Sequence, residues 1–117
     1  MEGDMDLEIF EYEGDGYDPT MSFENWRVAI ANFGKKFDRE SYNMLERHML
    51  TDEVFVLLKG EASLIIGKDR KEYKMEPCKI YNVKAGVWHN VLIEKGAKVL
   101  IVENHDTCDE NSEEFYF

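Results

Sequence analysis

The sequence has few cysteines, few prolines and no long hydrophobic run, and each scarcity excludes a class of protein. Its two cysteines, Cys78 and Cys108, lie far apart and lack the CxxC spacing of a zinc ribbon or the density of a disulfide framework. The two prolines accompany 44% hydrophobic residues, a composition typical of a packed domain. No apolar run reaches the length of about 20 residues that a membrane span needs. We expect a globular protein with free thiols.

Basic residues are also scarce, and their absence is concentrated at the two ends. The chain has 14 Lys and Arg against 25 Asp and Glu, a net charge of −11. Segments 1–18 and 103–117 contain many acids and no Lys or Arg. Nucleic acid and anionic lipid both require basic surface, so we expect neither as a partner. The acidic N-terminus does not resemble a signal peptide, which predicts a cytoplasmic protein with acidic, solvated terminal segments.

The length and the local patterns predict one all-β domain over residues 1–117. A chain of 117 residues suits a single hydrophobic core. Short runs rich in β-branched and aromatic residues alternate with Gly, Asp and Lys, as strands alternate with turns. The predicted strands are Leu7–Tyr12, Asn25–Asn32, Tyr42–His48, Val54–Lys59, Ala62–Ile66, Glu72–Met75, Lys79–Val83, His89–Glu94, Lys98–Glu103 and Glu114–Phe117. So many strands imply a sandwich or a barrel.

Two segments before residue 40 are read differently from the rest. Glu13–Pro19 combines glycine, aspartate and proline and is predicted to be a loop. Phe23–Phe37 could be helical, with Trp26 and Ile30 on one face. These residues also alternate with Arg27 and its neighbours at a period of two, so we favour a strand with the bulky residues on its buried face.

Two short motifs combine histidine, glutamate and glycine at fixed spacings. The first contains Glu46, His48, Glu53 and Gly60, and the second contains Gly86 and His89. They resemble the two motifs of the RmlC-like cupin superfamily, in which HxH is followed by a glutamate and a glycine, and PxG by a histidine and an asparagine. Glu46 stands where the family has its first histidine. Lys84 replaces the proline and Ile93 the asparagine.

The resemblance implies a cupin-type double-stranded β-helix, or jelly-roll barrel, with a divalent metal in its interior. The implied ligands are Glu46, His48, Glu53 and His89, and Glu53 could also act as a catalytic base. Glu46 and His48 are two residues apart on a predicted strand, so both would face the same side. This mixed nitrogen and oxygen set suits Fe, Mn, Ni or Zn.

Each of these residues also has an ordinary structural interpretation. The two histidines could lie on exposed strand faces, and Glu46 could pair with Arg47 or Lys59 at the rim. His105 lies among acids without any motif spacing, and we expect it to face solvent. The predicted ligand pocket consists of Trp26, Tyr42, Met44, Tyr81 and Trp88, although core packing is the commoner role of such side chains.

The resemblance leaves two classes of function open. The first is a metal-dependent enzyme of the lyase, isomerase or dioxygenase type that acts on a small polar acid or a sugar-like molecule, loosely similar to ureidoglycolate lyase-like cupins, with Lys84 attracting an anion. The alternative is a non-catalytic module that binds or senses a small molecule without a tightly held metal. A barrel interior filled by Tyr42, Met44 and Trp26 would instead indicate an interaction protein.

We also expect a homodimer. Sheet edges left open in a small barrel need cover, and a second subunit commonly provides it. The segments Leu7–Tyr12 and Glu114–Phe117 are the candidates for that contact.

Overall fold

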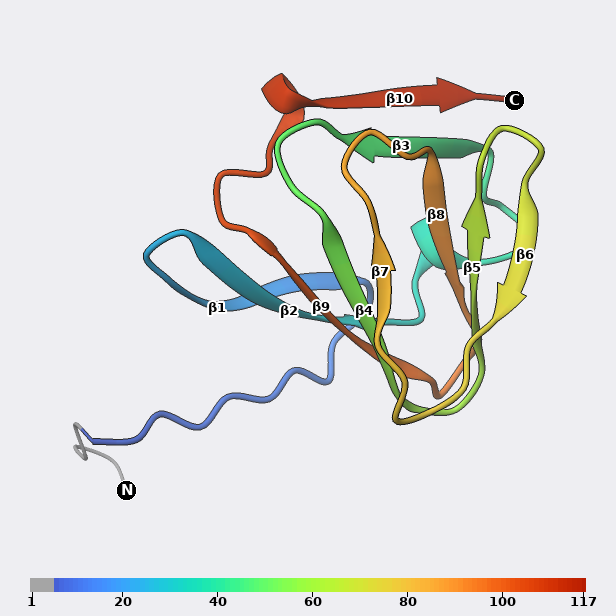
Figure 1. Ribbon diagram of the computed structural model, residues 1–117. Coiled ribbons are helices and arrows are strands. Elements are labelled where there is room, and N and C mark those ends of the chain that lie inside the picture. Colours follow the sequence, from blue (N-terminus) through green and yellow to red (C-terminus); the bar gives the residue numbers. More distant parts are fainter. Residues whose placement is uncertain (1–5) are drawn as a thin grey trace.

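The computed structural model describes residues 6–117, which form ten strands and two short 3₁₀ turns (Figure 1). The strands are β1 (Tyr17–Phe23), β2 (Trp26–Asn32), β3 (Met44–His48), β4 (Glu53–Lys59), β5 (Ala62–Ile66), β6 (Lys71–Lys74), β7 (Tyr81–Val83), β8 (His89–Ile93), β9 (Lys98–Asn104) and β10 (Ser112–Tyr116), and the turns are η1 (Lys35–Phe37) and η2 (Asp109–Asn111). The all-β prediction is confirmed. Within residues 6–117, no helix has the length and apolarity needed to cross a membrane.

The strands form two five-stranded antiparallel sheets that face each other. The first sheet has the order β1-β2-β9-β4-β7, and the second has the order β10-β3-β8-β5-β6. Consecutive strands often belong to different sheets, so the chain crosses repeatedly between them (Figure 1). This arrangement is the two-sheet barrel that the strand rhythm predicts.

The main hydrophobic core lies between the two sheets. Alternate residues of the central strands point inward, as Phe55 and Leu57 do from β4 and Val91 and Ile93 from β8. A smaller cluster of Leu45, Ile65 and Leu92 lies on the other face of the second sheet. Tyr42, Trp88 and Phe115 pack against this smaller cluster. The main core fills one end of the barrel and leaves space at the other.

Gly60 allows the chain to pass from the first sheet to the second between β4 and β5. Its φ is +79°, in the region that favours glycine. A Cβ atom at this position would lie 2.6 Å from the Cα of Ala97. The glycine that ends the first motif is therefore required by both conformation and space.

The N-terminal part differs from the sequence prediction. Leu7–Tyr12 belongs to neither sheet, whereas β1 begins inside the predicted loop Glu13–Pro19. β1 contains Pro19, which lies in an edge strand beside a break in the register between Asp18 and Met21, where its missing N–H costs no ladder hydrogen bond. The first five residues of the predicted acidic segment 1–18 lie outside the described residues.

The strand prediction for β2 is confirmed, but its two faces are exchanged. Ala29 and Ala31 are fully buried between the sheets and Arg27 lines the interior, whereas Trp26 is 42% exposed. The bulky residues therefore point outward. Ala29 and Ala31 belong to the main hydrophobic core cluster.

Candidate metal centre

A cavity of about 550 Å³ lies between the two sheets at the end that the main core leaves open. Its polar lining comes from both sheets. The first sheet contributes Tyr17, Arg27, Glu53 and Glu103, and the second contributes Glu46, His48 and His89. All four predicted metal ligands therefore meet in one cavity. Because this cavity is open, the barrel interior is not filled by Tyr42, Met44 and Trp26, the packing that would indicate an interaction protein.

His89, on β8, is 3% exposed and has both ring nitrogens engaged. Its Nδ1 lies 2.9 Å from the backbone oxygen of Val87, and its Nε2 lies 2.9 Å from Oε1 of Glu53. A carbonyl oxygen can only accept, so Nδ1 must carry a proton. In a neutral ring, Nε2 then has a lone pair directed at a carboxylate oxygen. Only a cation, either a proton or a metal ion, makes this contact favourable.

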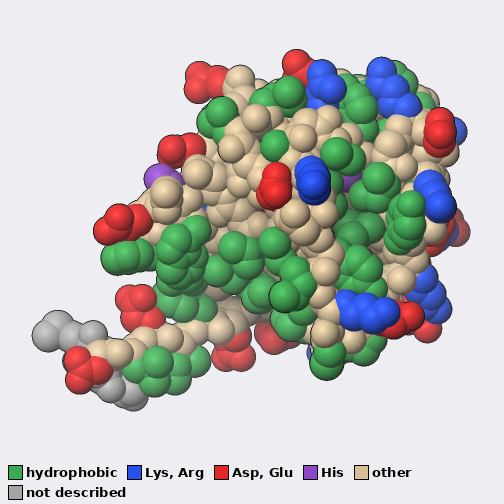
Figure 2. Space-filling view, viewed as in Figure 1, with side chains coloured by type: hydrophobic (Ala, Val, Ile, Leu, Met, Phe, Trp, Pro, Cys, Tyr) green, Lys and Arg blue, Asp and Glu red, His purple; other side chains and the backbone are tan. Residues whose placement is uncertain are grey.

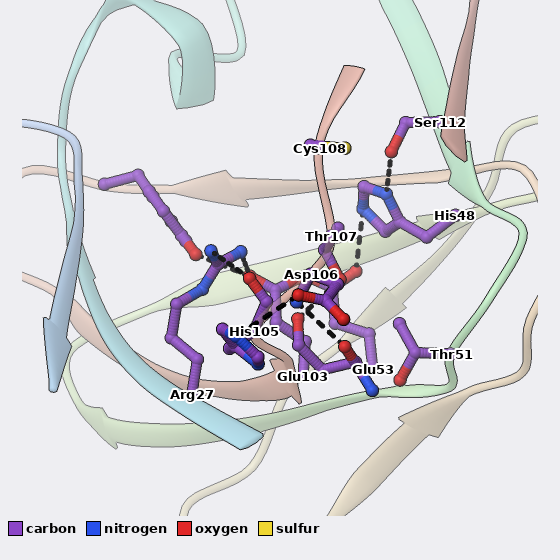
Figure 3. Close-up of polar contacts among 12 residues, drawn as sticks. Arg27, His48, Thr51, Glu53, Glu103, His105, Asp106, Thr107, Cys108 and Ser112 are labelled. Carbon is purple, nitrogen blue, oxygen red and sulfur yellow. Dashed lines mark hydrogen bonds and ion pairs between the residues drawn. The ribbon is translucent and has the colours of Figure 1, made fainter. Parts of the chain in front are cut away.

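His48, on β3, is arranged in the same way. Its Nδ1 lies 2.8 Å from the hydroxyl of Ser112 on β10, and its Nε2 lies 3.2 Å from the same Oε1 of Glu53 (Figure 3). Metal-binding histidines commonly anchor one ring nitrogen on an oxygen and present the other to the ion. Both histidines here have this arrangement, and both Nε2 atoms converge on one carboxylate oxygen.

Glu53, at the start of β4, is buried and ionised. Burial alone would raise the pKa of its carboxyl, but the hydrogen bonds from His48 and His89 outweigh burial and lower the pKa to about 2. Burial would also lower the pKa of His48, yet the hydrogen bond and charge of Glu53 raise it above the ordinary histidine value. The two imidazoles and this carboxylate form one electrostatic unit.

Glu46 replaces the histidine of the family motif and lies at the edge of this unit. It pairs directly with His89 in the β3–β8 register. Its carboxylate, with a nitrogen of His48 and one of His89, forms a group of ligand atoms within 4.8 Å of one another. Lys36 reaches the same carboxylate at 3.5 Å. Glu46 is thus placed either to complete the ligand set or to remain paired with Lys36.

Three residues of the cavity were missed by the sequence analysis. The Oε2 atom of Glu103, on β9, accepts hydrogen bonds from the Tyr17 hydroxyl at 2.5 Å and from Nη2 of Arg27 at 2.6 Å. The Glu103 carboxylate also lies within 4.8 Å of ligand atoms of His48 and Glu53. Burial and the nearby charge of Glu53 raise the pKa of Glu103, and burial and the hydrogen bond to Glu103 raise that of Tyr17.

One signal in the sequence could have identified part of this group. Arg27 stands among apolar residues of a predicted strand, and a charge on a buried face requires a partner. In the structure Arg27 lies directly opposite Glu103 in the β2–β9 pairing. Tyr17 gives no such signal, because it lies within Glu13–Pro19, whose glycines and proline predict a loop.

None of the five residues of the predicted ligand pocket, Trp26, Tyr42, Met44, Tyr81 and Trp88, lines this cavity. Trp26 lies outside because the faces of β2 are exchanged. Tyr42 and Met44 line a separate pocket of about 410 Å³. Tyr81 packs against the main core, where its hydroxyl accepts the Glu76 N–H at 2.9 Å.

Trp88 points to the opposite side of the sheet from its neighbour His89. It packs on the smaller core cluster beside Phe115, with the guanidinium of Arg47 4.4 Å from the centre of a Trp88 ring. Lys84, predicted at the mouth, does not line the cavity either. His105 is exposed and contacts Asp106 at 3.2 Å, in agreement with its expected place in solvent.

The donor set fits a divalent transition metal. Two buried imidazoles with anchored Nδ1 atoms face a buried, ionised carboxylate, and further carboxylates lie within reach of the same space. Mixed nitrogen and oxygen ligands of this kind suit Fe, Mn, Ni or Zn. The close approach of Glu53 and Glu103 would also be relieved by a cation.

Comparisons with known proteins identify the fold. A cupin-2 domain protein from Shewanella frigidimarina is 14% identical, with a TM-score of 0.62 over 80% of this chain and 85% of that one. The Streptomyces nucleoside dehydratase Pac13 is 7% identical, with a TM-score of 0.66 over 92% and 86% of the two chains. The Fe(II) form of HppE is 18% identical, with a TM-score of 0.59 over 76% of this chain and 50% of that chain. No family model matches the sequence, and no curated protein matches it.

These similarities show the fold alone, because the identities are low. The chain has the cupin fold, so the fold prediction made from the two motifs is confirmed. The motifs of this chain also coincide with the polar end of its own barrel, where His48, Glu53 and His89 converge.

Proposed function

We propose that this protein is a divalent-metal-dependent cupin enzyme that acts on a small, polar, uncharged molecule such as a sugar or a nucleoside. The contact between Nε2 of His89 and Oε1 of Glu53 carries the proposal. The Val87 carbonyl fixes the proton on Nδ1, so the facing pair of Nε2 and carboxylate requires a second proton or a metal ion between them. A metal ion satisfies both histidines and Glu53 at once.

The residues of the two motifs hold the ion, and those of the first sheet complete the site. His48, His89 and Glu53 are the proposed ligands, with Glu46 as the fourth. A bound divalent metal would act as a Lewis acid that polarises an oxygen of the substrate. Because Glu53 is held by both imidazoles, we assign it to ligation rather than to the role of catalytic base. The Tyr17 hydroxyl, hydrogen-bonded to Glu103, is the proposed proton-carrying group.

The charges around the cavity favour a neutral substrate over an acid. The acidic lining residues are Glu46, Glu53, Glu103, Asp109 and Glu114, and the basic ones are Arg27 and Lys36. Both bases already have carboxylate partners, at 2.6 Å for Arg27 and 3.5 Å for Lys36. Among the described lining residues no Lys or Arg is therefore left to pair with a substrate carboxylate. The hydroxyl groups of a neutral substrate could instead donate hydrogen bonds to these carboxylates.

The structural neighbours are consistent with this substrate class. Pac13 is described as a nucleoside dehydratase, and several of its structures contain uridine. Its likeness to this chain is one of fold, and we use it only to choose nucleosides as the first compounds to test. A cavity of about 550 Å³ is large enough for molecules of this size.

The alternative is a binding or sensing module without chemistry. It is favoured by the replacement of a family histidine with Glu46, whose carboxylate is partly neutralised by Lys36. Such a protein would bind a ligand in the cavity and form no product. The two functions differ in metal content, because the module would hold no metal tightly, and they differ in turnover.

Elemental analysis of protein purified without a chelator or an affinity-metal column tests the metal site. We expect close to one Fe, Mn, Ni or Zn per chain, and loss of most of it in Glu53→Gln and His89→Gln. His105→Gln is the matched control, because it removes an exposed histidine outside the cavity. Wild-type protein that holds no metal after reconstitution, or equal loss in all three variants, would contradict the proposal.

A second experiment separates the enzyme from the binding module. Metal-loaded protein is screened for thermal stabilisation by neutral sugars and nucleosides, beside the corresponding uronic acids and nucleotides. Each stabilising compound is then incubated and analysed for products by mass spectrometry. Product formation from a neutral compound supports the proposal. Binding without a product supports the sensing module, and preference for the acids would contradict the assignment of a neutral substrate.

A further inference from the structure

A second pocket, of about 410 Å³, lies beside the metal cavity, at the turn η1 and the start of β3. Its lining includes Lys35 and Lys36 from η1, Ser41, Tyr42 and Asn43 from the segment that follows, and Asn90 from β8. The lining of the metal cavity contains five carboxylates, whereas the described lining of this second pocket contains two lysines and no Asp or Glu. We call it the lysine pocket. Its charge is opposite to that of the neighbouring cavity.

The turn η1 fixes the backbone that carries both lysines. Phe37 is 4% exposed in the main hydrophobic core, and its N–H donates to the Gly34 carbonyl at 3.0 Å. The Ser41 hydroxyl donates to the Lys35 carbonyl at 2.8 Å. Successive side chains of a 3₁₀ turn point about 120° apart, so a pocket that both Lys35 and Lys36 line wraps around the turn. Two ammonium groups are therefore offered to one space from an anchored backbone.

The two lysines have little negative charge to balance them. Within residues 6–117 no carboxylate pairs with Lys35, and Lys36 pairs with Glu46 at 3.5 Å while its side chain stays 49% exposed. Two like charges on adjacent residues repel each other, and an anion held between them removes this repulsion. The Tyr42 hydroxyl and the Asn43 side-chain amide add hydrogen-bond donors to the same wall. Such a combination of cations and donors suits an oxyanion.

The charge around the lysine pocket favours an anion, although the whole chain carries −11. Residues 19–102 hold all 14 Lys and Arg but fewer than half of the 25 acids. Figure 2 shows most of its visible Lys and Arg side chains over the strands of the second sheet, and mainly Asp and Glu around β1 and the N-terminal segment. The lysine pocket belongs to the second sheet through β3 and β8. Exposed charges farther away than about 10 Å are largely screened, so the local excess decides.

Two residues, Lys36 and Asn90, line both the lysine pocket and the metal cavity. Asn90 is 2% exposed and is held on both sides, because its Nδ2 donates to the Met44 carbonyl at 2.9 Å and its Oδ1 accepts the Val91 N–H at 2.8 Å. Lys36 is the exposed and mobile part of this shared wall, as a long side chain with a single ion pair to Glu46. It therefore connects the two sites.

We propose that the lysine pocket binds an oxyanion of the phosphate or sulfate type between Lys35 and Lys36, and that the bound anion strengthens metal binding in the neighbouring cavity. The anion site stands on the lysine pocket alone. The effect on the metal rests on the proposed function, because it acts through Glu46, the proposed fourth ligand.

The direction of the coupling follows from the position of Lys36. Without an anion, the Lys36 ammonium lies 3.5 Å from the Glu46 carboxylate and competes with a metal ion for it. An anion in the lysine pocket attracts Lys36 and leaves Glu46 free to bind the metal. Linkage requires the reverse effect as well, since a metal that takes Glu46 releases Lys36 to the anion. The loss of an ion pair of this exposure changes an equilibrium by up to about fivefold.

Nuclear magnetic resonance of metal-free, isotope-labelled protein tests the anion site without any metal. Inorganic phosphate should move the amide signals of η1 and the side-chain amide of Asn43 with saturation, at a Kd of about 1 mM or below. Lys35→Met should raise this Kd at least about threefold. Lys74→Met is the matched control, because it removes a lysine that is 70% exposed and lines neither pocket. Shifts that sodium chloride reproduces at equal ionic strength, or equal effects of the two variants, would overturn the anion site.

Glycerol phosphate, titrated in the same way, separates two sources of the anion. Tighter binding than that of inorganic phosphate assigns the lysine pocket to the phosphate group of a larger molecule. Equal or weaker binding assigns it to a free anion.

The coupling is measured as the Kd of Zn²⁺, by chelator competition, with and without saturating sodium sulfate at constant ionic strength. Sulfate should lower the wild-type Kd about fivefold. Lys36→Met should bind Zn²⁺ without sulfate as tightly as the wild type does with it, and should not respond to sulfate. A wild-type Kd that sulfate leaves unchanged or raises would overturn the coupling. Protein that binds no Zn²⁺ in either condition would contradict the proposed metal site, while the phosphate titration still decides the anion site.

Discussion

Replacement of Arg27 with methionine should destabilise the protein strongly, because it leaves the Glu103 carboxylate buried without its cation. The Arg27 side chain is 18% exposed and that of Glu103 is 3% exposed, and their atoms lie 2.6 Å apart. Methionine retains most of the aliphatic stem of arginine, so packing changes little. What is lost is the charge that compensates Glu103 beside the ionised Glu53.

The expected magnitude follows from the burial of the pair. Removing one partner of a buried ion pair costs about 3–5 kcal/mol. The Tyr17 hydroxyl still donates to Glu103, and Arg27 is not completely buried, so we expect a value near the lower limit, about 3 kcal/mol. For a domain of this length, about 4 °C of Tm per kcal/mol converts this cost to roughly 12 °C.

Urea and thermal unfolding in the presence of EDTA measure this change without interference from metal. Arg47→Met is the matched control, because Arg47 also pairs with a glutamate across strands, at Glu113, but on the surface. Its loss should cost less than about 1 kcal/mol. Adding Glu103→Gln to Arg27→Met should restore about 2 kcal/mol, since no unpaired buried charge then remains. A cost for Arg27→Met no greater than that of Arg47→Met, or no recovery in the double variant, would refute the reasoning.

Two further predictions concern stability. Gly60→Ala should cost about 1–3 kcal/mol by urea unfolding, and more than Gly67→Ala, because both glycines have positive φ but only Gly60 lies against Ala97. Glu72→Gln should lower stability at neutral pH by no more than about 1 kcal/mol, because the Arg39–Glu72 pair is exposed to solvent. Its hydrogen bond from Arg39 lowers the Glu72 pKa to about 2, so the difference from wild type should persist above about pH 4.5 and vanish as the pH falls toward 2. A difference that grows in acid would contradict this sign.

The sequence was sufficient to predict the cupin fold and four residues that line one cavity, because the two motifs that carry both predictions are defined by local spacing. Glu46 and His48 share a face two residues apart on one strand, and the spacing from His48 to Glu53 is part of the motif. Such patterns can be recognised in the sequence without knowledge of the tertiary structure.

The rest of the cavity depends on which face of each strand meets the opposite sheet. Periodicity allows either face of β2 to be the inner one, and hydrophobicity alone predicts that the bulky residues face the interior. The structure buries Ala29 and Ala31 instead and leaves the bulky side chains on the outer face of the first sheet. The same reversal brings Arg27 to Glu103 and removes Trp26 from the predicted pocket.

The most direct test of the metal centre is an anomalous-difference map from a crystal of the metal-loaded protein, measured at the absorption edge of the metal found by elemental analysis. We predict a strong peak within coordination distance of Nε2 of His48, Nε2 of His89 and the carboxylate of Glu53. No peak among these three side chains in a crystal of protein that retains its metal, or a peak held elsewhere on the chain, would contradict the account.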